Sequence, residues 1–449
     1  MVPTDNVNDS GHREIAGGEN RKSRSPAKIQ TVVAKLRSRG WSHWTIAALV
    51  LAIGILFTDY ADEHLQLDVV RNALSQKLLE WYWRPPEPGD VKVVLIRDED
   101  YWQPGLGGRV PIRRDFLAHV VKALDDANAF VIGLDFDMRL PHPSKLWDFP
   151  EYHEESLDLA RAVVAAAEHH KIVLPKTVRR VVSGRYQLEP DLYQLYGICT
   201  QLNPNGQWSD PGTAELGISK RAANNISCGY IKLNLDKREL PTQVILTNGA
   251  LLDSFSLSVA RAHNPSRVAD VGSSLLYASY IRPEQLDPPD KRDGTRVVYS
   301  AHEVISGSLD SMAAMNAQTV IVGSDWNTRA EGRGPKTDLH DTPVGPMGGA
   351  MVHLNFAEAF LDLRTYHHVP HAVTTALEIG LSAGAAIWFA LLAGPGQKIL
   401  ALVTGTVLLI GVEWVTLNLF GLFLEVFVPF VGLWIHSLFE GFAARTPGH

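Results

Sequence analysis

Residues 91–100, VKVVLIRDED, give the clearest indication of the fold, because a largely apolar, β-branched run ends abruptly in charged residues. A second run of this kind, FVIGLDF, occupies Phe130–Phe136. Between them lies an amphipathic stretch that reaches Ala127, with Asp115 placed to cap it. Strands that are apolar on both faces and alternate with helices predict a parallel sheet covered on both sides.

The same alternation continues on either side of these two runs. Further strands are expected at Lys171–Pro175, Tyr230–Leu235, Gln243–Leu246 and Thr319–Ser324, the middle two paired with each other. Helices are expected at Asp62–Trp83, Asp115–Ala127, Ser156–His170, Ser254–His263 and Met351–Leu363. Residues 179–227 are rich in Gly, Pro, Asn and Gln, and we interpret them as an excursion over the sheet edge.

The N-terminal region combines a basic segment with an uncharged apolar run. Residues 1–40 are expected to be a disordered cytoplasmic arm, whose seven Lys and Arg residues between Arg21 and Arg39 favour a cytoplasmic N-terminus. Residues 41–60 would form a membrane helix of about 20 residues. The alternatives are a cleaved signal peptide, against which the long basic region argues, and a basic arm without topological meaning.

The C-terminal region is apolar almost to its end and divides at turn residues. Membrane helices are expected at residues 374–393, 399–417 and 422–442, followed by a cytoplasmic tail at 443–449. Glu425, Pro429, His436 and Glu440 leave a re-entrant or interfacial helix open for the last span. Counting spans from the N-terminus places residues 61–371 outside the cytoplasm, which is the periplasm if the cell is Gram-negative. The expected fold is thus an α/β extracytoplasmic domain with a mostly parallel sheet plus an α-helical membrane bundle, in a multi-pass protein of the cell membrane.

Charged residues gather where the predicted strands end, and there we place a ligand site. The expected ligand-binding residues are Asp98, Arg113, Arg114, Asp135 and Asp341. Ligands of open parallel sheets bind outside the carboxyl ends of the strands. The alternative is that the aspartates cap helices and pair with the arginines.

A few isolated residues invite separate hypotheses. Cys199 and Cys228 could form a disulfide in an oxidising compartment. Glu413 is a carboxylate inside a predicted span, where it either meets Asn418 or another subunit, or reaches the interface beside Trp414. His367, His368 and His371 could bind a metal or simply occupy the interface. His169 and His170 are explained by the dipole of the helix they end.

Several function classes find no support in the sequence. The net charge of −7 argues against a nucleic-acid partner. The glycines at 105–108 and 332–334 lack the spacing of a phosphate-binding loop, and no Gly-x-Ser-x-Gly elbow occurs. We therefore predict no metal, no cofactor and no enzymatic activity.

Three stretches together resemble a known family. VVLIRDEDYW, VPIRRDFLAHVVKALDDANAFVIGLDFDMRLP and TVIVGSDWN with DTPVGPMGGAMVHLNFAEAFL are similar to the second type of CHASE sensory domain, over most of residues 60–370. The resemblance implies an extracytoplasmic sensor with one membrane helix before the domain and three after it. Such domains usually precede a cytoplasmic output module, which we do not expect here.

The leading functional hypothesis is a membrane-anchored sensor or receptor that relays a signal to a separate cytoplasmic partner. Its expected partners are membrane lipid, an unknown extracytoplasmic ligand, a cytoplasmic signalling protein and further copies of itself. Two alternatives stay open: an extracytoplasmic enzyme or metal-binding domain that uses the strand-end carboxylates, and an oligomeric membrane scaffold or transport component.

Overall fold

The computed structural model divides the chain into two compact units, which are described separately. The larger unit comprises residues 61–374 and 409–425, and the smaller one 1–60, 375–408 and 426–449. The residues whose structure is described are 77–78, 87, 89–139, 149–182, 184–198, 216–233, 240–268, 275–278, 280–287, 296–330, 333–342, 344–369, 371–392 and 395–423. The predicted arm, the first membrane helix and nearly all of the helix at Asp62–Trp83 lie outside this set.

The centre of the larger unit is a parallel sheet, called sheet A here. Among the described residues it has six strands in the order β11-β1-β12-β2-β3-β6, and each neighbouring pair is parallel. The strands are β1 (Val91–Arg97), β2 (Val131–Leu134), β3 (Lys171–Lys176), β6 (Ile226–Tyr230), β11 (Val298–Ser300) and β12 (Thr319–Asp325). The mostly parallel α/β sheet expected from the sequence is thereby confirmed.

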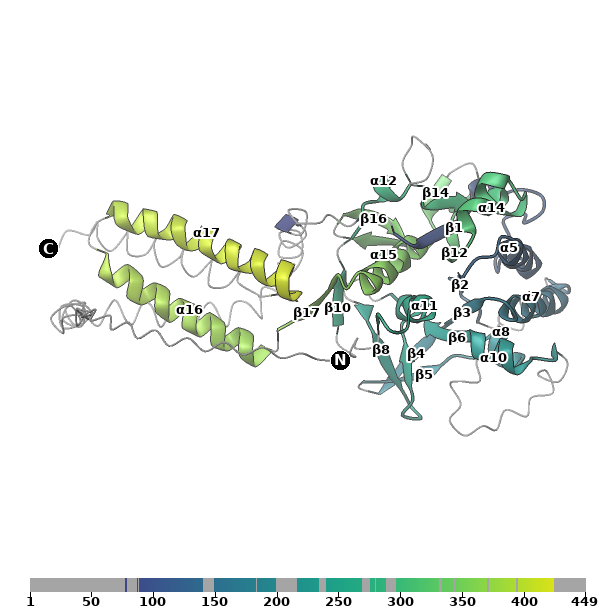
Figure 1. Cartoon of the computed structure of the whole chain (residues 1–449), viewed down its shortest axis with the longest axis horizontal. Helices are drawn as coiled ribbons and strands as arrows, with labels where there is room; N and C mark the ends of the chain where they lie inside the picture. The colour runs from purple at the N-terminus through teal and green to yellow at the C-terminus, as the bar shows by residue number, and fades with distance from the viewer. Residues whose placement is uncertain are drawn as a thin grey trace, which may run out of the picture. The chain divides into compact units, whose positions relative to one another are not determined.

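Helices cover both faces of sheet A (Figure 1). One face of the sheet, called the α5 face here, is covered by α5 (Arg114–Asp126), α7 (Tyr152–Ala167), α10 (Lys220–Asn225), α13 (Ala301–Ile305) and α14 (Leu309–Met315). The opposite face, called the α15 face here, is covered by α11 (Phe255–His263) and α15 (Gly349–Leu361). Successive residues of a strand point to opposite faces, so each strand contributes apolar side chains to both cores.

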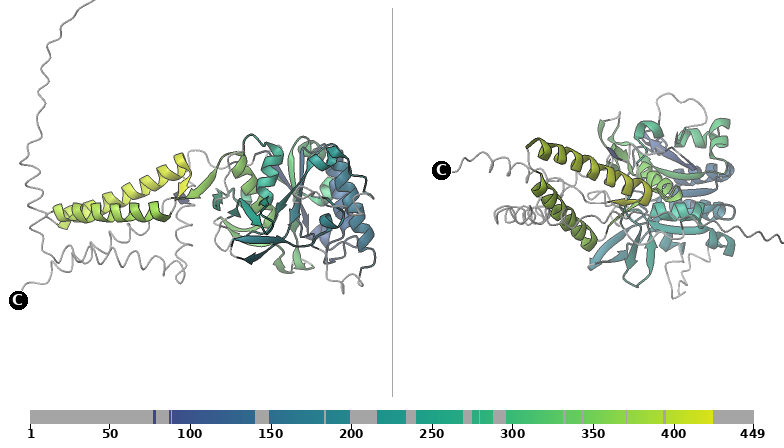
Figure 2. Two further views of the ribbon diagram at one scale, coloured as in Figure 1. Left: turned by 90° about the horizontal axis from the view of Figure 1, so that it is seen from below. Right: turned by 60° about the vertical axis from the view of Figure 1, so that its left-hand side comes forward.

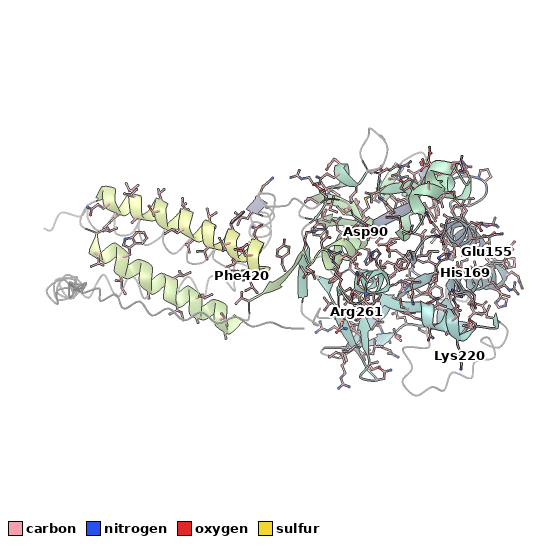
Figure 3. The ribbon with its side chains drawn as sticks, in the orientation of Figure 1. Asp90, Glu155, His169, Lys220, Arg261 and Phe420 are labelled. Atoms are coloured by element: carbon pink, nitrogen blue, oxygen red, sulfur yellow. The ribbon has the colours of Figure 1, made fainter. Side chains whose placement is uncertain are left out.

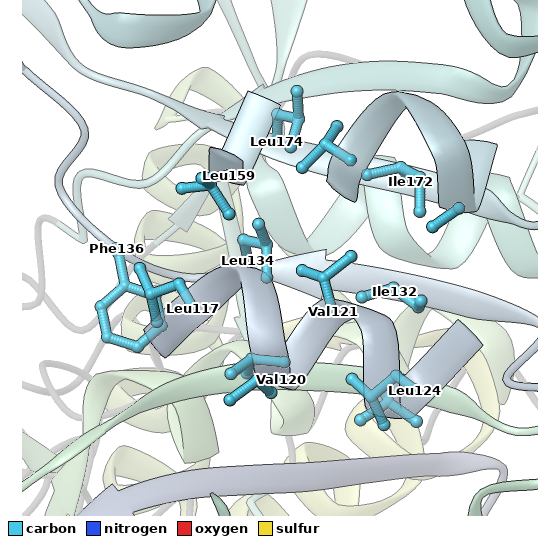
Figure 4. Close-up of a cluster of buried hydrophobic side chains, with 14 of the residues drawn as sticks. Leu117, Val120, Val121, Leu124, Ile132, Leu134, Phe136, Leu159, Ile172 and Leu174 are labelled. Atoms are coloured by element: carbon cyan, nitrogen blue, oxygen red, sulfur yellow. The ribbon is translucent and has the colours of Figure 1, made fainter. Parts of the chain in front are cut away.

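The core of the α5 face shows why the sequence folds this way (Figure 4). Leu117, Val120, Val121 and Leu124 recur at helical spacing and form one buried stripe on α5. Figure 4 shows this stripe against Ile132 and Leu134 of β2, with Leu159 of α7 and Ile172 and Leu174 of β3 completing the cluster. The amphipathic pattern between the first two strands therefore forms the helix expected from it.

The predicted excursion at residues 179–227 contributes to a second sheet, two strands of which lie after residue 240. Strands β4 (Val178–Val182), β5 (Arg185–Leu188), β8 (Gln243–Leu246) and β9 (Leu251–Asp253) pair in the order β4-β5-β8-β9. The strand expected at Tyr230–Leu235 was placed wrongly, because β6 ends at Tyr230 and pairs with β3 rather than with Gln243–Leu246. The sequence did not indicate β6 as a strand because its middle consists of Ser227, Cys228 and Gly229, although β6 is buried for most of its length.

Two hairpins follow β12 along the chain. The first pairs β13 (Asn327–Arg329) with β14 (Arg333–Lys336), and the second pairs β15 (Leu339–Thr342) with β16 (Gly345–Gly348). Asn327 and Lys336 of the first hairpin bond Asp98 and Asp325 at the carboxyl edge of sheet A. These hairpins therefore cover the edge at which a ligand site was expected.

A third sheet, called sheet D here, joins segments from distant parts of the sequence. Its order is β18-β17-β10-β7, from Leu422–Phe423, Thr365–His368, Leu275–Ala278 and Leu240–Pro241. Strand β17 follows α15, and β18 follows the long helix α17. Leu78, Tyr366 and Leu417 form a small buried cluster next to this sheet.

Two long helices occupy the C-terminal region, α16 (His371–Leu391) and α17 (Pro395–Phe420) (Figures 1 and 2). Gly396–Phe420 is the only helix of the described residues that is long and apolar enough to cross a membrane, with a mean hydropathy of 2.0. The connection between the spans expected at 374–393 and 399–417 is shorter than expected, since α17 already begins at Pro395. Leu422 and Phe423, expected to open the last span, form β18, and the rest of that span lies outside the described residues.

Candidate functional site

The residues predicted to bind a ligand divide between several places at the carboxyl edge of sheet A. Asp98 follows β1 and Asp135 follows β2, with β12 between these two strands. Arg113 and Arg114 begin α5 on one face, whereas Asp341 lies exposed on β15. The five residues therefore do not line one crevice, although Asp98 and Asp135 both lie where strands of sheet A end.

Asp98 connects the end of β1 to the first hairpin after β12. One of its carboxylate oxygens accepts the backbone N–H of Asn327 at 2.7 Å, and the other accepts the side-chain amide of Asn327. Asp325 likewise pairs with Lys336 at 2.6 Å. Asp98 therefore neither caps a helix nor pairs with an arginine among the described residues, and both of its oxygens are engaged by Asn327.

Arg113 belongs to a network of ion pairs at the start of α5. It bonds Asp115 and lies 3.7 Å from Glu155, while Arg109 forms a two-bonded pair with Glu155. Figure 3 labels Glu155 on α7. The helix begins at Arg114 instead of after Asp115, so Asp115 lies inside the first turn. The network fixes the N-terminal turns of α5 and α7 against each other.

Arg114 differs from its neighbours because its charge is buried without a carboxylate. Its side chain is 2 % exposed, donates to the sulfur of Met138 at 3.2 Å and lies 4.8 Å from the ring centre of Tyr152. Within the described part of the chain no carboxylate bonds its guanidinium. A buried cation without an anion is costly, so this is a place where an anion would be stabilised.

Tyrosines surround this charge. Tyr193 is fully buried, and its hydroxyl has no hydrogen-bond partner among the described residues. Burial raises the pKa of Tyr193, and of Tyr152, above the ordinary range, while the charge of Arg114 acts on both phenols in the opposite direction. We call Arg114, Tyr152 and Tyr193 the Arg114 cluster; it presents donors without a matching acceptor.

A buried ion pair lies beside this cluster. Lys176, the last residue of β3, bonds both carboxylate oxygens of Asp191 at 2.8 and 3.0 Å, and both residues are almost fully buried. Burial lowers the pKa of Lys176, and Asp191 opposes that shift. The ammonium also lies 5.9 Å from the ring centre of Tyr193. In contrast to Arg114, this cation is compensated.

Asp135 points to the other face of the sheet and joins a second group of polar side chains. Nε2 of His353 lies 3.6 Å from Asp135, and Nδ1 of His353 lies 2.8 Å from the Ser256 hydroxyl. Asp338 acts on both Asp135 and His353 and is held by His340 at 2.9 Å. We call Asp135, Ser256, His353 and Asp338 the His353 cluster.

Burial disfavours the charged forms of Asp135 and His353 in the His353 cluster. Burial raises the pKa of Asp135 well above its ordinary range, and the nearby Asp338 raises it further. Burial also lowers the pKa of His353 to about 4. One oxygen of Asp135 has no hydrogen-bond partner in the described part of the structure. The arrangement can share or store a proton, because both groups disfavour their charged forms.

The chain Ser256–His353–Asp135 has the residue types of a nucleophilic triad but not the access that one requires. Ser256 is fully buried, and His353 is 1 % exposed. A substrate must reach the hydroxyl of a nucleophile, and the base must stand ready to accept its proton. With the pKa of His353 lowered to about 4, the imidazole is a weak base, and the geometry fits a structural polar network.

The sequence did not single out Ser256, His353, Tyr193 or Lys176. For His353 a signal was present, because polar residues stand within the otherwise apolar stretch MVHLNFAEAFL. Polar residues that are buried on a helix usually have specific partners. For Tyr193 and Lys176 no local pattern indicates burial, since their environment depends on how β3 and α7 pack.

A groove of about 720 Å³ opens elsewhere, where β3 and β6 begin. It contains Lys171, Arg261 and His263. Each has a partner in the structure, namely Asn225 for Lys171, Asp253 for Arg261 and Thr319 for His263. Charges that are already paired attract a ligand less than the cation of Arg114 does.

Three other predicted positions are only partly visible. Cys228 is disulfide-bonded, but Cys199 lies outside the described residues, and the pairing of the two stays a prediction. Glu413 is 3 % exposed within α17, and the Asn418 amide bonds the carbonyl of Trp414 instead. His367 and His368 belong to β17, and nothing is described of their side chains.

The comparisons with known proteins agree with this architecture. The CHASE2 domain model matches residues 46–395, which is most of the chain. The comparisons with curated proteins and with solved structures found no match. The chain therefore belongs to the CHASE2 domain family, a family of extracytoplasmic sensory domains.

Proposed function

We propose that this chain is a membrane-anchored sensor whose α/β domain binds a small anion at the Arg114 cluster and relays the bound state to a separate cytoplasmic partner. The observation that carries the proposal is the buried guanidinium of Arg114, which has no carboxylate among the described residues and stands beside the unbonded hydroxyl of Tyr193. Because Arg114 and Tyr193 are as buried as His353, a small carboxylate or phosphate group would enter only through a local opening of the domain, and it would then accept from both donors.

The relay is proposed to pass through sheet D. Helix α15 carries His353 and is followed directly by β17, which pairs with β18 through His367↔Leu422 and His368↔Phe423. Strand β18 follows α17, the helix that is apolar enough to span a membrane. A shift of α15 would therefore act on one short sheet to which the start of α16 and the end of α17 are both attached.

The membrane arrangement is part of the same proposal. Helix α16 has 21 residues, which at 1.5 Å each gives about 31 Å, so its length matches the hydrocarbon core although only α17 among the described helices is also apolar enough to cross it. Helix α16 would cross the membrane towards the cytoplasm and α17 would cross back, which places Lys398 between them on the cytoplasmic side. An alkaline phosphatase reporter fused near Asp236 should be active, whereas activity restricted to a fusion at Lys398 would reverse the topology.

Ligand binding is tested with inorganic phosphate and acetate as probes on purified full-length protein in detergent. A saturable rise in the unfolding temperature is expected for wild type and not for Arg114→Met. Arg161→Met, which removes an exposed arginine from α7, is the control and should retain the response. Neither anion stabilising the wild type, or both stabilising Arg114→Met equally, would reject the Arg114 site.

Stability without ligand separates anion binding from a structural role. A structural arginine should destabilise the protein when replaced, because its contacts are lost. An arginine kept for a ligand should leave the protein unchanged or stabilised as methionine, since the uncompensated buried charge is removed. Hydrogen exchange of residues 365–368 and 422–423, with and without the stabilising anion, then tests whether sheet D responds.

A further inference from the structure

The last turns of α5 and α7 bring three potential metal ligands together, away from both clusters described above. Asp125 lies near the end of α5, and His169 and His170 follow α7. Oδ1 of Asp125 is 2.9 Å from Nε2 of His170 and 3.5 Å from Nδ1 of His169. The ligand atoms of all three residues lie within 4.8 Å of one another.

We propose that Asp125, His169 and His170 bind a divalent transition-metal ion of the zinc class. Zinc binds imidazole nitrogen and carboxylate oxygen at about 2.0–2.2 Å in tetrahedral geometry, which separates neighbouring ligand atoms by roughly 3.3–3.5 Å. The observed separations bracket that value, so small side-chain movements suffice to close the shell. Three protein ligands leave a fourth position for water.

The local electrostatics call for a cation at this point. Asp125 and Asp126 stand in the last turn of α5, where the helix dipole is negative, and that turn contains no basic residue. The last turn of α7 has no basic residue either. Carboxylates placed against a helix dipole are unfavourable, and a bound metal ion offsets the carboxylate and both helix ends at once.

A simple hydrogen bond between His170 and Asp125 explains less of the geometry. That bond uses the buried His170, whose side chain is 7 % exposed. It does not explain His169, which is 64 % exposed and nevertheless directs Nδ1 to the same carboxylate. Two imidazoles that converge on one carboxylate oxygen provide the arrangement that a shared cation would use.

Exposure and ligand type determine which ions could enter. The ring of His169 leaves one side open to solvent, so the ion can load without unfolding of the domain. Two imidazoles favour zinc, copper, nickel or cobalt over magnesium and calcium, which prefer oxygen ligands. The site is therefore expected to discriminate against the hard divalent cations.

The ion would fasten together the two helices that carry the Arg114 cluster at their other ends. Arg114 opens α5 and Tyr152 opens α7, whereas the metal ligands lie where the same helices end. Metal binding would thus stiffen this helix pair on the α5 face. The site itself depends only on Asp125, His169 and His170, so it stands or falls independently of anion binding.

The test uses untagged full-length protein in detergent, stripped with chelator, with zinc chloride as the probe. Equilibrium dialysis followed by metal analysis should give a high-affinity zinc ion that is lost, with at least a tenfold fall in affinity, in His169→Ala and in Asp125→Asn. His119→Ala removes an exposed histidine from the same helix and should bind as wild type does. A combined replacement of His367, His368 and His371 by alanine should also retain this ion.

Cobalt substitution gives a second readout that does not depend on affinity alone. The absorption spectrum of tetrahedral cobalt is expected for wild type and not for His169→Ala. Magnesium should displace neither zinc nor cobalt from the site. Circular dichroism verifies that the variants remain folded. Zinc binding that is absent in wild type, or equal in wild type and His169→Ala, would overturn the proposal.

Discussion

The two faces of sheet A bury charged residues in opposite ways. On the α5 face, ionisable groups form pairs, as Lys176 does with Asp191 and Arg109 with Glu155. On the α15 face, Asp135, His353 and Glu358 are buried with shifted pKa values that favour their neutral forms. Pairing and neutralisation are the two ways to avoid a bare buried charge, and they respond differently to mutation and to pH.

Among the described residues of the α5 face, Arg114 and the carboxylate of Asp100 depart from this pairing, but Asp100 accepts two backbone N–H groups whereas the guanidinium of Arg114 donates to the sulfur of Met138. The other buried cation there, Lys176, has a carboxylate, whereas the guanidinium of Arg114 has none within the described residues. A face that pairs its charges elsewhere leaves one cation for an anion from outside the chain. This contrast is why the ligand proposal rests on the α5 face and not on Asp135.

The largest expected effect comes from breaking the pair on the α5 face. Lys176→Met leaves the carboxylate of Asp191 without its lysine, which should destabilise the protein by about 3–5 kcal/mol. Lys176→Met combined with Asp191→Leu should recover most of that loss, because no buried charge remains. Urea unfolding of the full-length protein measures both. Lys122→Met, on the exposed side of α5, should be nearly neutral, and an equally small effect at Lys176 would contradict the paired description.

The next effect tests how tightly α15 packs on the opposite face. A Cβ added to Gly323 of β12 would stand 2.3 Å from the Cβ of Ala350 and 3.6 Å from a carboxylate oxygen of Asp135. Gly323→Ala should therefore displace α15 and destabilise the protein by about 1–3 kcal/mol.

The matched control for this change is Gly105→Ala, where an added Cβ meets no atom within 4 Å. Adding Ala350→Gly to Gly323→Ala removes the colliding methyl group and should recover part of the loss. Recovery would show that the contact between β12 and α15 is the cause. Equal effects at Gly105 and Gly323 would contradict close packing at the His353 cluster.

A third effect separates neutralisation from pairing by its pH dependence. Burial raises the pKa of Glu358 from 4.5 to about 7, although its carboxylate accepts the N–H groups of Gly89 and Val91. Because the folded state holds this proton more tightly, the stabilisation is complete below pH 4.5 and is lost as pH rises through 7.

The free energy of unfolding of Glu358→Gln should thus equal that of wild type near pH 4.5 and be about 1–3 kcal/mol larger at pH 8. The glutamine oxygen can still accept from both backbone N–H groups. Unfolding at the two pH values measures the difference, and Glu99→Gln, on the exposed surface, should show none of this pH dependence. A variant that is less stable than wild type at pH 8 would mean that the carboxylate is needed in its charged form.

How much the sequence predicts differs between the fold and the site. The runs at Val91–Ile96 and Phe130–Phe136 predicted buried parallel strands, because an apolar run between two helical patterns has few other solutions. The strand β6 escaped prediction, since Ser227, Cys228 and Gly229 are weak strand formers that are stabilised here by pairing with β3. Local propensity cannot report such tertiary pairing.

For the site, the sequence indicated the correct edge of the sheet but not the partners. Asp98 and Asp135 each come directly after a strand, yet Asp98 binds Asn327 and Asp135 faces His353. The two side chains differ because alternate residues of the strand-end segments point to opposite faces of the sheet. Arg113 and Arg114 are neighbours whose environments differ for a similar reason. Which arginine lacks a carboxylate depends on the helix phase of α5 and cannot be derived from composition.

The smallest effect concerns His169, on the outer surface of the α5 face. In zinc-free buffer, His169→Ala should change the free energy of unfolding by less than about 0.5 kcal/mol, because the side chain is 64 % exposed. With zinc at a hundredfold excess over its dissociation constant, wild type should gain about 2.7 kcal/mol and the variant much less. A large destabilisation without zinc would mean that His169 already supports the fold by itself, and the α5 face would then use hydrogen-bonded histidine, not a metal ion, to offset Asp125.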